Sequence, residues 1–359
     1  SRSRSQFLWV VGNRLKFNEQ GVVPVNTTSL NLDHKEWEQG WYLNEIVVLA
    51  SSIAGLFHDF GKANDLFQQK LKGLTQSQGE PYRHEWVSLR LFESFTKGKS
   101  DNNWLNQLEK IYEGGHGVLV EKQVLSNLYM DETETQNAFE GLAPFAKLVA
   151  WLIVSHHRLP MAHGDSVQIE DIEMWLAKCF NCHWNSSNAI ELSKYDAKTI
   201  KQNWRFTHGT PFLSKPWQHK ASRLAKRALN TPLLLMGNVQ WFEQRFVSHM
   251  ARLSLMLADH YYSSLPIEKS KSAWRDSQYK AIANTDRQNA KRTSHKPKQQ
   301  LDEHNIGVAA NAQRFAQNLP ALKYTLPAIA QHKLFTKLAG HEKYQWQYKA
   351  FFQAKSIAK

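Results

Sequence analysis

Cysteine is nearly absent from this chain, since only Cys179 and Cys182 occur among its 359 residues. A framework of disulfides, which stabilises many small secreted domains, is therefore excluded. The two thiols and His183 spell C-x-x-C-H, the pattern of c-type haem attachment and the beginning of a zinc knuckle. Residues 1–5 form no export signal, which haem attachment requires, and no second Cys pair completes a four-thiolate zinc site. We expect reduced, partly buried thiols in a cytoplasmic protein.

Long apolar runs and phosphate-binding loops are also missing. The longest apolar run, residues 148–154, falls well short of the ~20 residues that span a bilayer, so we expect no membrane partner. Residues 97–100 end like a phosphate-binding loop, but Glu93 stands where the first Gly of that motif is needed. The usual kind of nucleotide-triphosphate motor is therefore not expected within this chain.

Strand patterns are sparse and helical periodicity dominates, which predicts an all-α fold. Apolar residues make up 42% of the chain and include 18 Phe and 13 Trp, enough for a substantial core. The predicted helices span residues 43–58, 84–96, 135–157, 168–179, 188–203, 218–229, 237–263, 301–318 and 344–356. Residues 284–300 are polar and basic, and we interpret them as an exposed linker.

The net charge of +13 comes from one part of the chain. Residues 201–300 hold 18 Lys or Arg and 5 Asp or Glu, whereas the rest of the chain is balanced. Rings that can stack on bases and cations that can bind phosphates alternate in this part, which suits single-stranded nucleic acid. The alternatives are a solvated basic face or a surface for an acidic protein. The candidate nucleic-acid-binding residues are Trp204, Arg205, Trp217, Lys220, Arg223, Lys226 and Arg227.

His58 and Asp59 form an adjacent pair within the run from Gly55 to Lys62. A carboxylate can bridge two divalent ions while an imidazole binds one of them. Lys62 lies about one helical turn beyond the pair, from which its ammonium can reach the same site. The dipeptide alone is more often a solvated helix end, so further ligands must decide between the two interpretations.

Three later segments offer such ligands. His84 opens an amphipathic stretch, His156 and His157 follow an apolar helix that Pro160 soon ends, and Asp259 ends another apolar run. A buried carboxylate is costly unless it is paired or bound to a metal, so Asp259 should have a cationic partner. Taken singly, each of these residues could equally be an ordinary helix-end or cap residue.

In this order, the motifs H-D-x-G-K, R-H-E and H-H and the late Asp resemble the HD superfamily. They resemble most closely the HD nuclease domain of the type I CRISPR-associated nuclease-helicases, of a type I-F-like kind. Residues 58–63, with Phe67-Gln68 after them, match the first motif, residues 82–88 the second and residues 155–157 the third. The resemblance covers roughly residues 43–263.

This resemblance implies an all-α HD-domain bundle that cuts single-stranded DNA with two divalent transition-metal ions. Lys62 would contact a phosphate oxygen, and Asp59 and Lys62 would be the catalytic residues. Imidazoles combined with carboxylates favour manganese, iron, cobalt or nickel over magnesium, which prefers oxygen ligands. The metal ligands carried over by the resemblance are His58, Asp59, His84, His156, His157 and Asp259.

Members of that family usually have a further metal-binding His on a helix before the H-D pair. Upstream of the pair this chain offers only His34, in a polar context. His304 instead lies on an apolar stripe whose residues step by three or four through residues 301–319. We hypothesise that the element is permuted to the C-terminal side and that His304 is the remaining metal ligand; a buried core histidine is the alternative.

The domain prediction is an HD nuclease domain over residues 1–283 with its core at about 43–263, the basic linker 284–300, and a helical extension 301–359 that could complete the fold. Residues 342–347 resemble the aromatic-Gln element before the helicase motor of the family. The resemblance thus implies a covalently following helicase, beyond this chain, and a CRISPR surveillance complex as partners. Competing functions are an HD phosphohydrolase of nucleotides or cyclic dinucleotides and a non-catalytic module that binds nucleic acid or protein.

Overall fold

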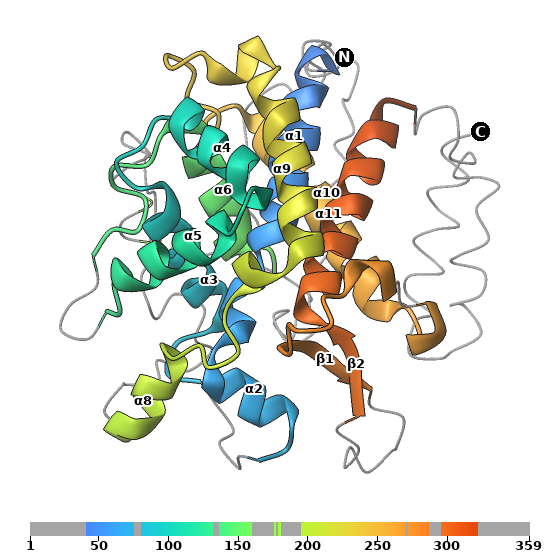
Figure 1. Cartoon of the computed structure of the whole chain (residues 1–359). Helices are drawn as coiled ribbons and strands as arrows, with labels where there is room; N and C mark the ends of the chain where they lie inside the picture. Colours follow the sequence, from blue (N-terminus) through green and yellow to red (C-terminus); the bar gives the residue numbers. More distant parts are fainter. Residues whose placement is uncertain are drawn as a thin grey trace, which may run out of the picture. The chain divides into compact units, whose positions relative to one another are not determined.

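Helix α1 (Asn44–Phe57) forms the centre of the fold, because twelve of its 14 residues are buried. A helix that is apolar on all sides must be surrounded by other elements. Helices α6 (Pro144–Ser155), α9 (Lys215–Leu229), α10 (Arg245–Ser264) and α11 (Leu301–Asn318) all pack against it (Figure 1). This computed structural model describes residues 41–74, 80–131, 136–159, 176, 179–180, 195–269, 272–286 and 296–321, which belong to one compact unit.

The fold is mostly helical, which confirms the predicted all-α class. The bounds of α3 (His84–Thr96) and α11 are those predicted, and α1 and α9 begin within three residues of the prediction. The helix predicted from residue 135 begins at Pro144, because proline is suited to the first turn of a helix. The helix predicted from residue 237 begins at Arg245, and the end of the one predicted at 188–203 is α8 (Ala197–Asn203).

Three short helices were not predicted: α2 (Asp65–Leu71), α4 (Asp101–Glu109) and α5 (His116–Ser126). The side chains of Asn64 and Ser100 accept hydrogen bonds from backbone N–H groups in the first turns of α2 and α4. Such caps begin a helix without a long apolar pattern. The helix predicted at 344–356, most of that predicted at 168–179, and residues 188–194 of that predicted at 188–203 lie outside the described residues.

A small antiparallel hairpin of β1 (Ile282–Asp286) and β2 (Lys296–Gln300) occupies both ends of the segment predicted to be a linker. That interpretation is wrong for residues 284–286 and 296–300, whereas residues 287–295 lie outside the described part of the chain. The strands pair with each other, and β2 runs directly into α11 (Figure 1). The hairpin is hard to predict from the sequence because its strands are polar. Gln299, for example, is buried although it is polar.

Helices α1 and α11 approach each other at Gly55. A Cβ atom at this position would lie 2.9 Å from the backbone of Ala309, a distance that real Cβ contacts do not show. Glycine therefore permits a backbone separation that alanine would increase. This close packing brings the first turn of α11 beside the end of α1.

The segment Trp41–Ala63, which contains α1, is long and apolar enough to cross a membrane by length and composition, with a mean hydropathy of 1.3. Polar residues interrupt this segment, so it does not stand out in the sequence as one long apolar run. In the structure 94% of its most apolar window is buried inside the fold, as in the core helix of a bundle.

Candidate metal centre

The predicted metal ligands meet near helix ends, except Asp259, which lies within α10. His58 and Asp59 directly follow α1, His84 is the first residue of α3, and His156 directly follows α6. A residue at a helix end is freed from the helical side-chain direction, so side chains from several helices can converge there. His304, in the first turn of α11, joins them from a distant part of the chain.

Two backbone contacts hold these helix ends together. A Cβ atom at Gly61 would overlap the carbonyl oxygen of His84, so the turn after Asp59 lies directly against the start of α3. The N–H of Gly61 also donates to Ser88 Oγ at 2.8 Å. On the other side, Arg252 of α10 donates from Nε and Nη2 to the carbonyl of Ser155, at 3.1 and 2.8 Å, just before His156.

Asp59 lies at the centre of the site, and its two carboxylate oxygens face different histidines. Oδ1 lies 3.4 Å from His84 Nε2 and 3.9 Å from His156 Nε2. Oδ2 lies 3.1 Å from His304 Nε2 and 3.3 Å from His58 Nε2. This single carboxylate thus connects two separate groups of imidazoles.

The ligand atoms form two groups, in each of which every atom lies within 4.8 Å of the others. Asp259 completes the second group, with its Oδ1 3.5 Å from His304 Nε2 and 3.9 Å from His58 Nε2. Both groups could hold a metal ion. The first group is Asp59, His84, His156 and His157, and the second is His58, Asp259 and His304.

The other ring nitrogen of each buried histidine is anchored to an oxygen. His58 Nδ1 lies 2.9 Å from the carbonyl of Gly55, and His156 Nδ1 lies 2.6 Å from that of Ile153. Because a carbonyl can only accept, Nδ1 of both rings carries a proton, which leaves Nε2 as the ring atom that could bind a metal. Metal-binding histidines in proteins are typically held in this way.

The remaining two rings follow the same rule with side-chain oxygens. His84 Nδ1 lies 3.3 Å from Glu85 Oε2, and His304 Nδ1 lies 3.0 Å from Gln299 Oε1. Apart from the ion pairs of the site, the Nε2 atoms of all four rings and both Asp59 oxygens are buried without a hydrogen-bond partner. Buried polar atoms are rarely left so, and a cation would satisfy all of them at once, so these residues fit a metal site.

The electrostatics of the site favour a bound positive charge. Burial opposes a charge on His58, yet the carboxylates of Asp59 and Asp259 raise its pKa to about 9. Burial and the imidazoles of His157 and His58 hold the pKa of His156 well below its usual range. Burial would raise the pKa of Asp59, but His58 and Lys62 hold it well below its usual range. The site therefore combines an ionised carboxylate with a neutral imidazole, both ready to bind a cation.

Lys62 lies where the sequence analysis expected it. Its Nζ is 2.7 Å from Asp59 Oδ2, and its side chain is 13% exposed. Burial would lower its pKa, but Asp59 and Asp259 raise it, so the ammonium stays charged. A partly exposed cation beside the two groups can meet an anionic substrate.

His157 differs from the other site histidines because it is exposed. Its ring centroid lies 4.0 Å from that of His156 and 5.4 Å from that of His84, at the rim of the first group. The alternative ligand His34 lies outside the described residues.

The structure corrects the prediction that two tryptophans stack on bases. Trp217 is fully buried, and its Nε1 donates to the carbonyl of Leu56 at 3.0 Å. Trp204 is also buried, with its ring 4.9 Å from that of Tyr82. Both rings lie against core helices because they occupy the apolar positions of basic segments, so neither offers a free face to a base.

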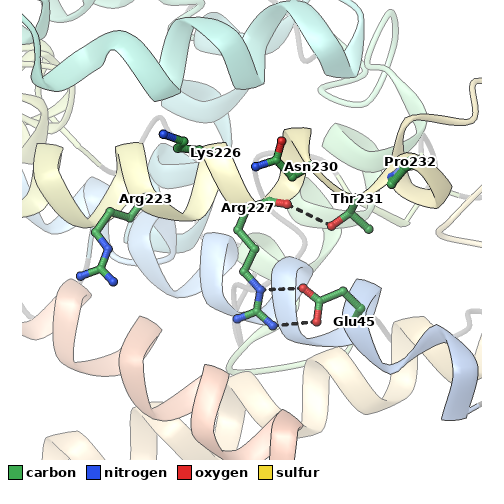
Figure 2. Close-up of a pocket in the computed structure, with 7 residues that line it drawn as sticks. All are labelled: Glu45, Arg223, Lys226, Arg227, Asn230, Thr231 and Pro232. Atoms are coloured by element: carbon green, nitrogen blue, oxygen red, sulfur yellow. Dashed lines mark hydrogen bonds and ion pairs between the residues drawn. The ribbon is translucent and has the colours of Figure 1, made fainter.

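The cations of the same prediction lie nearer to the surface. Arg223 and Lys226 of α9 are exposed, and Arg227 is half-buried in an ion pair with Glu45 at 2.6 Å. Figure 2 shows these side chains around a pocket on α9 together with Asn230, Thr231 and Pro232. The side chain of Arg205 is 73% exposed beside Asp65, and half-buried Lys220 donates to Gln313.

Three residues that support the site were missed in the sequence. Glu85 stands within the recognised R-H-E motif, but its contact with His84 had not been inferred. Arg252 and Gln299 carry no local signal, because their partners are a helix end and a ring that only the tertiary fold brings near. Cys179, by contrast, is half-buried, and its C-x-x-C-H partners lie outside the described residues.

Comparison with known proteins agrees with the motifs. No family model matches the chain. A CRISPR-associated nuclease/helicase Cas3 of subtype I-F/YPEST from Pectobacterium atrosepticum is 41% identical over 366 residues, which cover 99% of this chain and 32% of that protein. A protein of the same name from Pseudomonas aeruginosa is 39% identical over 355 residues, which cover 98% of this chain and 31% of its own length. The resemblance is thereby confirmed: along almost its whole length, this chain is homologous to about a third of the CRISPR-associated nuclease/helicases of subtype I-F.

Proposed function

We propose that this chain is a metal-dependent endonuclease that hydrolyses single-stranded DNA with two transition-metal ions, in CRISPR antiviral defence. The observation that carries the proposal is the position of Asp59. One of its carboxylate oxygens faces His84 and His156, and the other faces His58 and His304. A carboxylate shared between two sets of ligands is the arrangement that a two-metal phosphodiesterase requires.

Each residue then has a chemical role. Bound divalent ions would lower the pKa of a water molecule and neutralise charge on the scissile phosphate. Asp59 would offer one carboxylate oxygen to each position, and the charged Lys62 would stabilise negative charge that develops on the phosphate oxygens. The imidazole-rich ligand set favours manganese, iron, cobalt or nickel over magnesium.

The distribution of charge supports the proposed substrate class. Arg223, Lys226 and Arg227 lie along α9, with Lys220 one turn earlier. Such a row of cations suits the phosphates of a nucleic acid, whereas a small nucleotide would not need it. The name of the relatives, nuclease/helicase, agrees with a nucleic-acid substrate. With the tryptophans buried, binding by this helix is expected to depend on phosphate contacts rather than on stacked bases.

Partners beyond the DNA belong to the same proposal. Because the chain spans about a third of its relatives, we propose that a helicase follows it in the same polypeptide and that a CRISPR surveillance complex recruits it. The division into a nuclease domain over residues 1–283 and an extension from residue 301 also remains a proposal. His304 lies within that extension and reaches the candidate centre, which supports an extension that completes the site.

Cleavage of circular single-stranded DNA tests the proposal directly. The wild type and Asp59→Ala should be compared with manganese, nickel, magnesium and EDTA. We expect cutting with manganese or nickel, little with magnesium, and none with EDTA or in the variant. A circular substrate has no ends, so its loss reports endonuclease activity.

Two other results would replace the proposal. Hydrolysis of cyclic dinucleotides, without DNA cleavage, would identify a small-molecule phosphohydrolase. Tight DNA binding without cleavage in any metal would identify a binding module.

A further inference from the structure

The first turn of α11 is fixed in place independently of any metal. Leu301 N–H donates to the carbonyl of Ala281 at 2.9 Å, and Asp302 accepts from Ser214 Oγ at 2.8 Å. Glu303 accepts from Tyr262 Oη at 3.0 Å. These contacts position the backbone around His304, but none of them touches its ring. The orientation and the proton of that ring must be set by something else.

Gln299 is the residue that contacts the ring. Its side chain is buried, and its Oε1 lies 3.0 Å from His304 Nδ1. Its Nε2 donates to the carbonyl of Tyr262 at 2.9 Å. Since that carbonyl can only accept, the amide nitrogen must face Tyr262 and the amide oxygen must face His304. His304 Nδ1 therefore carries a proton, and its Nε2, 3.1 Å from Asp59 Oδ2 and 3.5 Å from Asp259 Oδ1, is the ring atom left to bind an ion.

The hairpin holds Gln299 in this orientation. Asn284 of β1 pairs with Gln299 of β2, and Asn284 Nδ2 donates to the same Oε1 at 2.9 Å. The register of the hairpin shifts on both sides of Asn284. Irregularities of this kind commonly re-aim a side chain, and here Asn284 faces the amide that contacts His304.

The hairpin is also tied to the segment that carries Lys62. Gln68 of α2 donates from Nε2 to the carbonyls of Lys62 and Ile282, at 2.7 and 2.9 Å, and its Oε1 accepts from Ile282 N–H at 2.9 Å. The same hairpin thus contacts the backbone beside both Lys62 and His304. Its side chains form a connected set rather than a surface loop.

From this network we infer that Gln299 is a positioning residue that fixes His304 for the second metal position, and that the β1–β2 hairpin exists to hold it. The inference rests on the proposed two-metal site. His58 and His156 need no such residue, because backbone carbonyls three residues earlier hold their rings. His304 has no equivalent local acceptor and depends on a side chain five residues away.

The test is a metal-content measurement that does not depend on cleavage. Wild type, Gln299→Leu and Gln299→Glu are dialysed against a series of fixed free Mn²⁺ concentrations, and manganese per chain is measured by mass spectrometry. We expect two ions in the wild type. Loss of the acceptor in Gln299→Leu should lower the affinity for one ion by about 10- to 100-fold and leave the affinity for the other unchanged. Gln299→Glu keeps an oxygen toward His304 and should restore much of that affinity.

The matched control is Gln300→Leu, the same change one residue along the strand. No described contact links its side chain to a metal ligand, and its Oε1 makes no hydrogen bond. Two ions are expected in this variant. Thermal unfolding in EDTA checks that each variant folds. If Gln299→Leu does not fold, Asn284→Ala is used instead, because it removes only the second donor to Gln299 Oε1. This variant should lower the affinity for the same ion to a smaller extent.

The outcomes separate this inference from the proposed function. Unchanged binding of both ions in Gln299→Leu, equal losses in Gln300→Leu, or no rescue by Glu would overturn the positioning role. A wild type that binds two ions but cuts no single-stranded DNA would overturn the nuclease and leave the role of Gln299 standing. A wild type that binds fewer than two ions would overturn both.

Discussion

At the scale of single residues, Asp59 differs from every other member of the site because it contacts both groups of imidazoles. Each histidine belongs to one group, so its loss should remove one ion, whereas the loss of Asp59 should affect both. Substitutions therefore distinguish a two-metal site from two unrelated clusters. This reasoning leads to different expected results for His304 and Lys62.

His304→Ala should reduce bound manganese from two ions to one and lower cleavage of single-stranded DNA by at least about 100-fold. The reason is that its Nε2 lies between Asp59 and Asp259, and removal of one ligand leaves their charges without a shared partner. His34→Ala, the alternative from the sequence, is the control and should bind two ions. Unchanged metal content and cleavage in His304→Ala would show that His304 is only a buried core histidine.

Lys62→Met should separate binding from chemistry. Its ammonium touches Asp59 but is not itself a metal ligand, so both ions should remain bound. Removal of one cation that stabilises developing charge typically costs about 10²–10³-fold in turnover, and a loss of this size is expected in the cleavage rate. Loss of a metal ion in this variant would instead assign Lys62 a structural role in the site.

The candidate metal ligands could be predicted from the sequence, but the exposure of individual side chains could not. The H-D pair, His84, His156 and Asp259 were named because each follows or begins an apolar run, and the structure brings them together. Trp217 was misplaced because it occupies the buried stripe of a strongly basic helix, where charge density concealed an apolar position. Charge on a helix indicates a partner for its exposed face only.

At the scale of elements, the contact between α1 and α11 sets how far His304 lies from His58. Gly55→Ala should test it, because the added Cβ would lie 2.9 Å from Ala309 backbone atoms. The helices must separate, at a cost of about 1–3 kcal/mol for overpacking, which exceeds the ~1 kcal/mol that Ala gains in helix propensity. Urea unfolding should therefore show a net loss of stability, together with weaker binding of the second ion.

The matched control is Gly237→Ala, since a Cβ at Gly237 would meet no atom within 4 Å. Its stability should change by less than about 0.5 kcal/mol. Equal stability of Gly55→Ala and the wild type would mean that α11 can shift without cost and that its distance from α1 is not fixed by glycine.

Long helices could be predicted at this scale, and the hairpin could not. The bounds of α3 and α11 follow from apolar periodicity. Strands β1 and β2 lack alternation because polar Gln299 is buried, where it accepts from Asn284 and contacts His304, instead of facing solvent. A polar segment is interpreted as a linker unless the residues to which it hydrogen-bonds, which are distant in sequence, are known.

At the scale of the whole molecule, the candidate site joins segments from His58 to His304, so the folded chain contains it and the unfolded chain does not. A ligand that binds only the folded state stabilises it by mass action. At a free Mn²⁺ concentration of 100 times the dissociation constant, each ion adds about 2.7 kcal/mol. Because the unfolding entropy is about 2.1 cal/mol/K per residue, about 1 kcal/mol shifts the Tm of a domain of this size by roughly 1–1.5 °C, and one ion should raise it by about 4 °C.

Thermal unfolding with Mn²⁺ and with EDTA therefore reports the integrity of the site without DNA. Asp59→Ala should lose nearly all of the manganese-dependent rise in Tm, because the Asp59 carboxylate faces imidazoles of both groups, whereas His304→Ala should keep about half. Gln300→Leu should retain the whole rise. An equal rise in Tm in Asp59→Ala and the wild type would place the bound manganese elsewhere on the chain. The buried ring nitrogens around Asp59 that lack a hydrogen-bond partner would then have to be satisfied by something other than manganese.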